Sequence, residues 1–144
     1  MSEAITETLI ADHRRCNELL TMIETAASCS DWRHIEKEAE SFAGAMERHF
    51  SFEENILCST LESASPMAAG LTGLMRKEHM QIRQLLTDLL TATKAGDADE
   101  CANVIMELHV ALEAHNTKEE DILYPLLDRA LGAKWTELLS RLAD

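Results

Sequence analysis

Apolar residues recur every three or four positions along most of the chain, which is the spacing of amphipathic helices. Four long stretches follow this pattern, at residues 4–27, 31–62, 66–95 and 97–123. Beyond Gly132, the segment KWTELLSRLA (134–143) is short and amphipathic, which predicts a fifth helix over one end of the others. We therefore expect an all-α protein with a single domain over residues 1–144, an up-down-up-down four-helix bundle with a short C-terminal fifth helix.

Residues that start or bend helices stand near the ends of these stretches. Ser30 and Asp31 are good N-cap types for the second stretch. Ser65 followed by Pro66 forms an N-cap and first-turn pair for the third. Pro125 is expected to kink the last turns of the fourth stretch, because it lacks the N–H that an α-helix needs.

The 144 residues carry a formal charge of −13, and the sequence pI is about 4.8. This charge argues against a nucleic acid or an anionic membrane as a partner. The first ten residues, MSEAITETLI, lack the basic region of a secretory signal, and no apolar run reaches membrane-spanning length, so we expect a cytoplasmic protein. The four cysteines, at positions 16, 29, 58 and 101, show no CxxC spacing, which favours reduced thiols.

The chain repeats itself with a shift of 66 residues. The segment MERHFSFEENILCSTL (46–61) aligns without gaps with LEAHNTKEEDILYPLL (112–127), and His13 aligns with His79. Each half is therefore a helical hairpin that carries one histidine on its first helix and an HxxxE motif on its second. Two such hairpins packed together predict a bundle with a pseudo-twofold axis.

Six ionisable residues occupy equivalent inward positions in the two halves. They are His13, His49, Glu53, His79, His115 and Glu119. Residues four apart lie on the same face of a helix, so each HxxxE motif presents a nitrogen and an oxygen inward. Burying such groups is costly unless they are paired or bind a metal, and the set exceeds what one zinc ion needs but suits two iron or manganese ions bridged by the glutamates. The alternative is a polar network inside a helical bundle that binds no metal.

This arrangement resembles the hemerythrin, or HHE cation-binding, family over nearly the whole chain, through His13, HFSFE (49–53), His79 and HNTKE (115–119). By that resemblance, the two glutamates bridge two non-haem iron ions and the four histidines are terminal ligands. An oxo or hydroxo group, or a diatomic molecule such as oxygen or nitric oxide, then completes the centre. Iron is favoured over manganese and zinc.

The oxygen-carrying members of this family have HxxxH on the third helix and HxxxxD on the fourth, whereas this chain has Arg83 at the second histidine position and HxxxE on the fourth. The symmetric set is closer to bacterial di-iron proteins linked to nitric oxide stress and iron–sulfur cluster repair. Three functions stay open: binding a diatomic ligand for sensing, storage or stress response; redox catalysis on peroxide or nitric oxide; and iron donation in iron–sulfur cluster repair. All three use the same centre, so spacing alone does not choose among them.

Several residues lie near the six candidates. Glu54 and Glu120 directly follow the two glutamates and are expected on solvated faces, because one residue turns an α-helix by about 100°. His34 and His109 are expected near solvent, away from the ligand face. Apolar side chains expected to limit water access to the centre are Met46, Met75, Ile82 and Leu112.

Three more positions are open to different interpretations. Cys16 is expected to face the interior, as a small apolar residue or as an oxidation-sensitive thiol. The hydroxyl of Tyr124 reaches either the centre or the surface at the bundle end. Arg83 offsets the acidic ligands, holds an anion or, as is commoner for a long basic side chain, extends outward. Ile122 is expected on the core face.

Overall fold

Helices make up most of the chain. The computed structural model describes residues 5–28 and 31–142, and within these ranges it contains helices and no strand. The long helices are α1 (Ile5–Ala27), α2 (Trp32–Phe52), α4 (Ala69–Ala95) and α5 (Ala98–Lys118). The shorter elements are the π-helical turn η1 (Glu53–Cys58), α3 (Ser59–Ala64), the 3-10 turn η2 (Pro66–Ala68), the π-helical turn η3 (Glu119–Leu123), α6 (Tyr124–Leu131), the 3-10 turn η4 (Gly132–Lys134) and α7 (Trp135–Leu142). The prediction of an all-helical chain with four long helices is confirmed for these residues.

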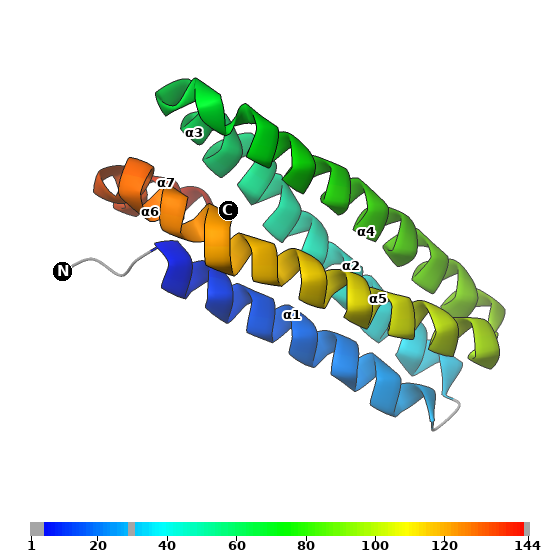
Figure 1. Ribbon diagram of the computed structural model, residues 1–144. Coiled ribbons are helices and arrows are strands. Elements are labelled where there is room, and N and C mark those ends of the chain that lie inside the picture. Colours follow the sequence, from blue (N-terminus) through cyan, green and yellow to red (C-terminus); the bar gives the residue numbers. More distant parts are fainter. Residues whose placement is uncertain (1–4, 29–30, 143–144) are drawn as a thin grey trace.

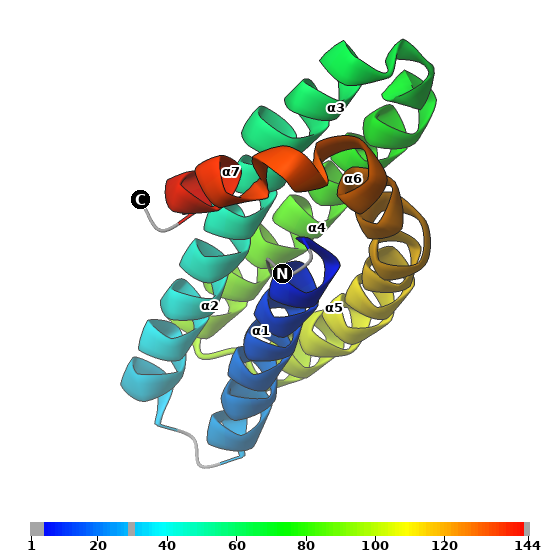
Figure 2. The same ribbon diagram turned by 90° about the vertical axis from the view of Figure 1, so that its left-hand side faces the viewer.

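The four long helices surround a common core. α1 packs against α2 and α5, and α4 packs against the same two helices from the other side. Figure 1 shows the α1–α2 and α4–α5 connections at one end of the molecule and α3, α6 and α7 at the other. In Figure 2, α6 and α7 cross the end at which α1 begins, where α6 packs against α1 and α3. Helices from both halves of the repeat therefore face one another across the core.

Two hydrophobic clusters divide the core along the helix axes. One lies toward the α1–α2 and α4–α5 connections and includes Phe42 and Leu89. The other lies toward α6 and α7 and includes Leu9 and Leu61. Each fully buried side chain of this size stabilises the fold by about 1.5–3 kcal/mol, which offsets the cost of burying polar groups nearby. On each long helix, the buried histidine stands where one cluster gives way to the other.

The helix ends agree with the sequence signals in part. The Asp31 side chain caps α2 by accepting a hydrogen bond from the backbone N–H of His34. Ser30 lies outside the described residues. The prediction that Ser65 caps the third long helix is wrong, because its side chain makes no capping hydrogen bond and a 3-10 turn separates it from α4. Gly96 ends α4 with a φ of +63°, a conformation that glycine adopts without the steric cost of a Cβ atom.

Each HxxxE motif ends where an α-helix widens into a π-helical turn. η1 begins at Glu53 and η3 begins at Glu119. The irregular turn in the second half lies ahead of Pro125 in the first turn of α6, and proline has no N–H with which to continue an α-helical hydrogen-bond pattern. The prediction that Ile122 lies in the core is wrong, because its side chain is 54% exposed. The wider turn changes the direction of every side chain that follows it.

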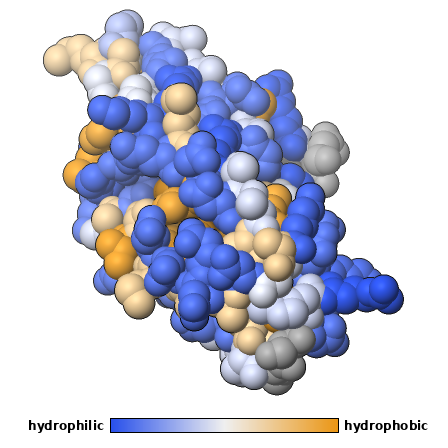
Figure 3. Space-filling view, turned by 90° about the vertical axis from the view of Figure 1, so that its right-hand side faces the viewer, coloured by the Kyte–Doolittle hydropathy of each residue, from blue (hydrophilic) through white to orange (hydrophobic). Residues whose placement is uncertain are grey.

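The surface is mostly hydrophilic. Figure 3 views the end of the molecule that carries the α1–α2 and α4–α5 connections, and hydrophilic side chains cover most of it with smaller hydrophobic patches between them. None of the described helices is both long and apolar enough to cross a membrane. The cytoplasmic location and the single domain stay predictions.

Cys16, Cys58 and Cys101 are buried and form no disulfide, and Cys29 lies outside the described residues.

Candidate metal centre

The fold brings all six predicted ligand residues together in the middle of the core. Their ligand atoms form two groups of four, and within each group all these atoms lie within 4.8 Å of one another. The first group consists of His13, His49, Glu53 and Glu119, and the second of Glu53, His79, His115 and Glu119. All six side chains are buried. Both groups share the two glutamates, so the arrangement has two halves joined by two carboxylates.

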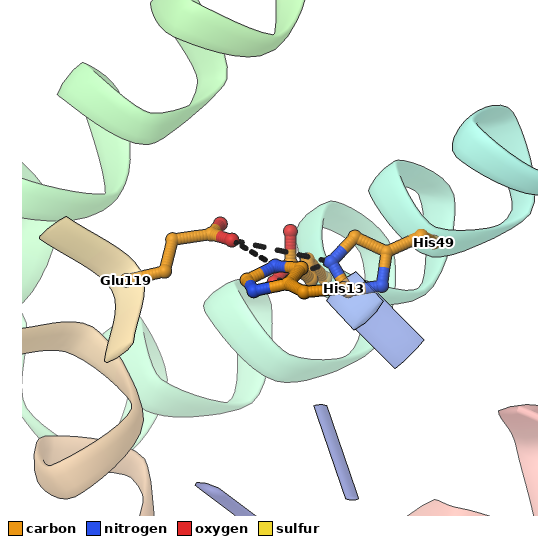
Figure 4. Close-up of side chains that lie close together, drawn as sticks. His13, His49 and Glu119 are labelled. Atoms are coloured by element: carbon orange, nitrogen blue, oxygen red, sulfur yellow. Dashed lines mark hydrogen bonds and ion pairs between the residues drawn. The ribbon is translucent and has the colours of Figure 1, made fainter. Parts of the chain in front are cut away.

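The first group joins α1 and α2 to the two π-helical turns. His13 Nε2 lies 2.9 Å from Glu119 Oε1. His49 Nε2 lies 3.1 Å from Glu53 Oε2 and 3.9 Å from Glu119 Oε1. Figure 4 shows the rings of His13 and His49 side by side, with the Glu119 carboxylate directed toward both. Two nitrogens and two oxygens thus converge from helices that are distant in sequence.

The second group uses the remaining oxygen of each glutamate. His79 Nε2 lies 3.2 Å from Glu53 Oε1 and 3.4 Å from Glu119 Oε2. His115 Nε2 lies 3.0 Å from the same Glu119 oxygen. Glu53 Oε1 and His115 Nε2 lie near groups of opposite charge, but both atoms are buried and neither makes a hydrogen bond. Because a buried polar atom without a partner is costly, a bound cation would satisfy both atoms.

Each of the four histidines is held from behind by a further carboxylate. The ring Nδ1–H donates to this carboxylate in four pairs: His13 to Glu120 at 2.8 Å, His49 to Asp12 at 2.6 Å, His79 to Glu54 at 2.7 Å and His115 to Glu78 at 2.8 Å. A carboxylate on Nδ1 fixes the tautomer in which the Nε2 lone pair faces the centre, and it makes that nitrogen a stronger metal ligand. The expectation that Glu54 and Glu120 lie on solvated faces is therefore wrong.

The π-helical turns explain how two consecutive glutamates both serve the centre. A π-helix has more residues per turn than an α-helix, so neighbouring side chains point in more similar directions. Glu53 reaches the centre while Glu54 reaches the ring of His79 behind it. In the other half, Glu119 reaches the centre while Glu120 reaches the ring of His13 from behind. The sequence does contain a signal for Glu54 and Glu120, because the 66-residue repeat aligns these two glutamates with each other.

Tyr124 lies in the centre itself. Its side chain is fully buried, and Oη donates toward Glu53 Oε2 at 2.5 Å and Glu119 Oε1 at 2.8 Å. The same oxygen lies 2.8 Å from His13 Nε2. An α-helix would rotate a residue five positions after Glu119 by about 140° from it. In the π-helical turn, the backbone N–H of Tyr124 instead bonds to the carbonyl of Glu119, and the two side chains meet.

Basic side chains surround the outer carboxylates. Arg83 pairs with Glu54 through Nη1 at 2.9 Å and also with Glu47, and its guanidinium lies over the ring of Phe50. It therefore offsets part of the acidic charge instead of extending freely outward. Lys118 pairs with Glu78 in a similar way, behind the second group. These cations compensate acids that contact the histidines.

The charges in the centre compensate one another. Burial raises the pKa of Glu119, but the histidine rings around its carboxylate, His115 foremost, hold it well below its usual range. Burial lowers the pKa of His79, yet the Glu119 and Glu53 carboxylates outweigh this and raise it to about 9. The pKa of His49 is raised well above its usual value, because its carboxylate neighbours, led by Glu53, outweigh the same effect of burial. The core therefore requires positive charge, which metal cations supply when they replace these protons.

Other candidate residues lie outside both groups. His34 is exposed and His109 is 40% exposed, where its ring lies 3.7 Å from Glu24, so neither contributes to the centre. Cys16 is buried in the hydrophobic cluster near the α1–α2 connection, as a small apolar residue would be. The donors in the two groups are imidazole nitrogens and carboxylate oxygens, a set that suits iron, manganese or zinc. Together they fit a metal centre.

Comparison with known proteins supports this interpretation of the geometry. The family model described as the hemerythrin HHE cation-binding domain matches residues 4–127, which include all six residues of the two groups. No curated protein and no solved structure matches the chain. Since the match spans most of the chain, including both halves of the repeat, the chain belongs to the hemerythrin HHE cation-binding domain family.

Proposed function

We propose that this protein holds two non-haem iron ions in its core and binds a diatomic ligand, oxygen or nitric oxide, at that centre. One ion would be held by His13 and His49 and the other by His79 and His115. Glu53 and Glu119 would bridge the two ions. The physiological role we propose is sensing, storage or a stress response.

One observation carries this proposal: each glutamate directs one carboxylate oxygen to the first group and the other oxygen to the second. Glu53 Oε2 faces His49 of the first group, and Glu53 Oε1 faces His79 of the second. Glu119 directs Oε1 to the first group and Oε2 to the second. A carboxylate that only balanced buried histidines would need no such division. Two carboxylates that each offer one oxygen to each of the two groups are suited to bridging a pair of ions.

The surrounding residues would prepare the centre for a small ligand. Met46, Met75 and Ile82 are buried beside the long-helix histidines and keep bulk water out. The ring of Phe50 stacks on His79 with centroids 4.0 Å apart, which fixes the plane of the imidazole. Bound iron would supply an open coordination position and a reversible redox couple. Apolar surroundings of this kind would favour a neutral diatomic molecule over water at the centre.

The helix order also enters the proposal. We infer an up-down-up-down arrangement in which each half of the repeat is one antiparallel hairpin, with α7 as a short fifth helix over the end of the bundle. This topology is supported by the packing of α1 and α4 against both α2 and α5. It would place the two HxxxE motifs on diagonally opposed helices, from which their glutamates extend across the core.

Metal analysis combined with visible spectroscopy tests the proposal. The untagged protein is loaded with ferrous iron without oxygen, the bound metal is counted, and spectra are recorded before and after exposure to oxygen or nitric oxide. We expect two irons per chain and a reversible spectral change, both abolished in Glu119→Ala and reduced in His49→Ala. Glu107→Ala on α5 is the matched control, because its side chain is exposed.

The outcomes separate the alternatives. Rapid consumption of peroxide by the loaded protein would replace ligand binding with redox catalysis. Iron that a mild chelator removes within minutes would favour iron donation. A protein that stays free of metal after ferrous loading, or that binds one zinc ion unaffected by either substitution, would refute the di-iron centre.

A further inference from the structure

The repeat fails at one position inside the centre. A shift of 66 residues pairs each ligand residue with its counterpart, but it pairs Tyr124 with Cys58. Both side chains are completely buried next to a π-helical turn. One brings a hydroxyl group into the core, and the other brings a thiol whose pKa burial raises to about 12. The two halves of the centre therefore differ chemically even though their histidines and glutamates match.

All contacts of the Tyr124 hydroxyl are with the first group. Oη lies 2.5 Å from Glu53 Oε2 and 2.8 Å from Glu119 Oε1, the two oxygens that face this group. It lies 2.8 Å from His13 Nε2 and 3.4 Å from His49 Nε2. These four atoms are the donor atoms of the first group. Tyr124 thus adds a fifth donor atom to a set that the repeat predicts to have four.

The separations are those of ligands around a single ion. With metal–ligand distances near 2.1 Å, donors at right angles lie about 3.0 Å apart and opposed donors about 4.2 Å apart. The distance of 2.9 Å between His13 and Glu119 and that of 3.1 Å between His49 and Glu53 are those of neighbours. The 3.9 Å between His49 and Glu119 is close to that of an opposed pair. The Tyr124 oxygen lies 2.5 to 3.4 Å from the same four atoms, so an ion bound among them would be within reach of Oη as well.

The second group has the opposite character. Two of its donor atoms, Glu53 Oε1 and His115 Nε2, are buried and make no hydrogen bond, although each lies near a group of opposite charge. The residue that the repeat aligns with Tyr124 is Cys58, which is fully buried and brings no hydroxyl group to the second group. The first group is thus closed by a hydroxyl group, while the second keeps unsatisfied donor atoms.

We propose that the phenol oxygen of Tyr124 is a further ligand at the metal position held by His13 and His49, so that a small exogenous ligand binds at the position held by His79 and His115. This inference rests on the proposed di-iron function. Coordination through Oη releases the hydroxyl proton to solvent, as metal binding releases protons from other ligands. The centre is then asymmetric, with one position closed by the protein and one open to ligand.

A ferric ion bound to tyrosine gives a visible charge-transfer band and enhances the ring vibrations in resonance Raman spectra. Tyr124 is the only tyrosine in the chain, so any such signal belongs to it. We expect the band in the iron-loaded, oxidised wild-type protein and its complete loss in Tyr124→Phe. Azide, used as a probe of open positions, should bind one per pair of irons in the wild type and two per pair in Tyr124→Phe.

Cys58→Ala is the matched control, because it removes the counterpart of Tyr124 and should leave both the band and the single azide unchanged. Iron is counted in every sample. Two irons per chain without the tyrosine signal in the wild type would overturn this inference and leave the proposed function intact. Failure of the wild type to bind iron would overturn both. An azide count of one in Tyr124→Phe that retains two irons would also contradict the inference.

Discussion

Each donor group has two histidines, and both groups share the two glutamates, but their surroundings differ. In the first group Glu120, 31% exposed, supports His13, whereas in the second the equivalent Glu54 is 17% exposed and pairs with Arg83. The residue equivalent to Arg83 in the other half is Asn17, which has no charge. The support behind the second group therefore includes a cation that the first group lacks at the equivalent position. A repeat that conserves the ligands still produces two chemically distinct positions.

Glu119→Gln should have the largest effect, because it removes an oxygen from both groups at once. We expect bound iron to fall from two ions per chain to nearly none. An amide offers one weaker oxygen donor and carries no charge to offset the cations. Metal analysis after ferrous loading and desalting measures this. Glu107→Gln on the preceding helix α5 serves as the control, and retention of both irons in Glu119→Gln would show that the glutamate is not shared.

A single histidine substitution should remove the metal ion from one position and leave the other position occupied. His13→Ala removes a donor from the first group only, and His79→Ala removes one from the second only. We expect about one metal ion per chain in each variant, counted after equilibrium dialysis against limiting iron. His109→Ala, outside both groups, should retain two. If either variant lost both ions, the two positions would have to fill as a single unit.

Removal of an outer carboxylate should weaken one position without abolishing it. Asp12→Asn affects the ring of His49 in the first group, and Glu78→Gln affects His115 in the second. Loss of such a partner lowers metal affinity by roughly 10- to 100-fold. Competition with a chelator of known affinity measures the change, and Asp99→Asn on the exposed start of α5 is the control. Equal affinity in the variants and the control would show that these acids do not support the ligands.

The smallest expected effect concerns Cys58, the residue that aligns with Tyr124 in the first half of the repeat. Burial, aided by the Glu53 carboxylate, raises the pKa of Cys58 from its ordinary 9.0 to about 12. Because the folded state holds this proton more strongly than the unfolded chain does, the resulting contribution to stability is complete below pH 9 and is lost as the pH rises toward 12. At pH 9.0, iodoacetamide should leave Cys58 unmodified in the native protein and alkylate it in urea, as mass spectrometry detects. Equal alkylation rates in both states would contradict this.

The ligand set could be predicted from the sequence because it depends on two simple periodicities. The four-residue spacing places His49 and Glu53 on one face of a helix, and the 66-residue repeat identifies their counterparts. The structure brings these residues together as expected. Their role as metal ligands stays a prediction.

The positions of Glu54, Glu120 and Ile122 were mispredicted because of the two π-helical turns, whereas Asp12 and Glu78 were missed because each acts on a histidine of another helix. The predictions for Glu54, Glu120 and Ile122 assumed 100° per residue, and this assumption fails after Glu53 and after Glu119. The position of Tyr124 was left open for the same reason. A π-helical turn leaves little trace in hydrophobic periodicity, because it is only 5 or 6 residues long and the ordinary α-helical period resumes after it in a shifted register.

The central claim is that both donor groups hold an iron ion. Diffraction from crystals of the iron-loaded protein, with data collected on both sides of the iron absorption edge, tests it most directly. The account predicts two anomalous peaks, one next to His13 and His49 and one next to His79 and His115, with a carboxylate oxygen of Glu53 and of Glu119 on each. A single peak, or iron bound only outside these groups, would contradict it.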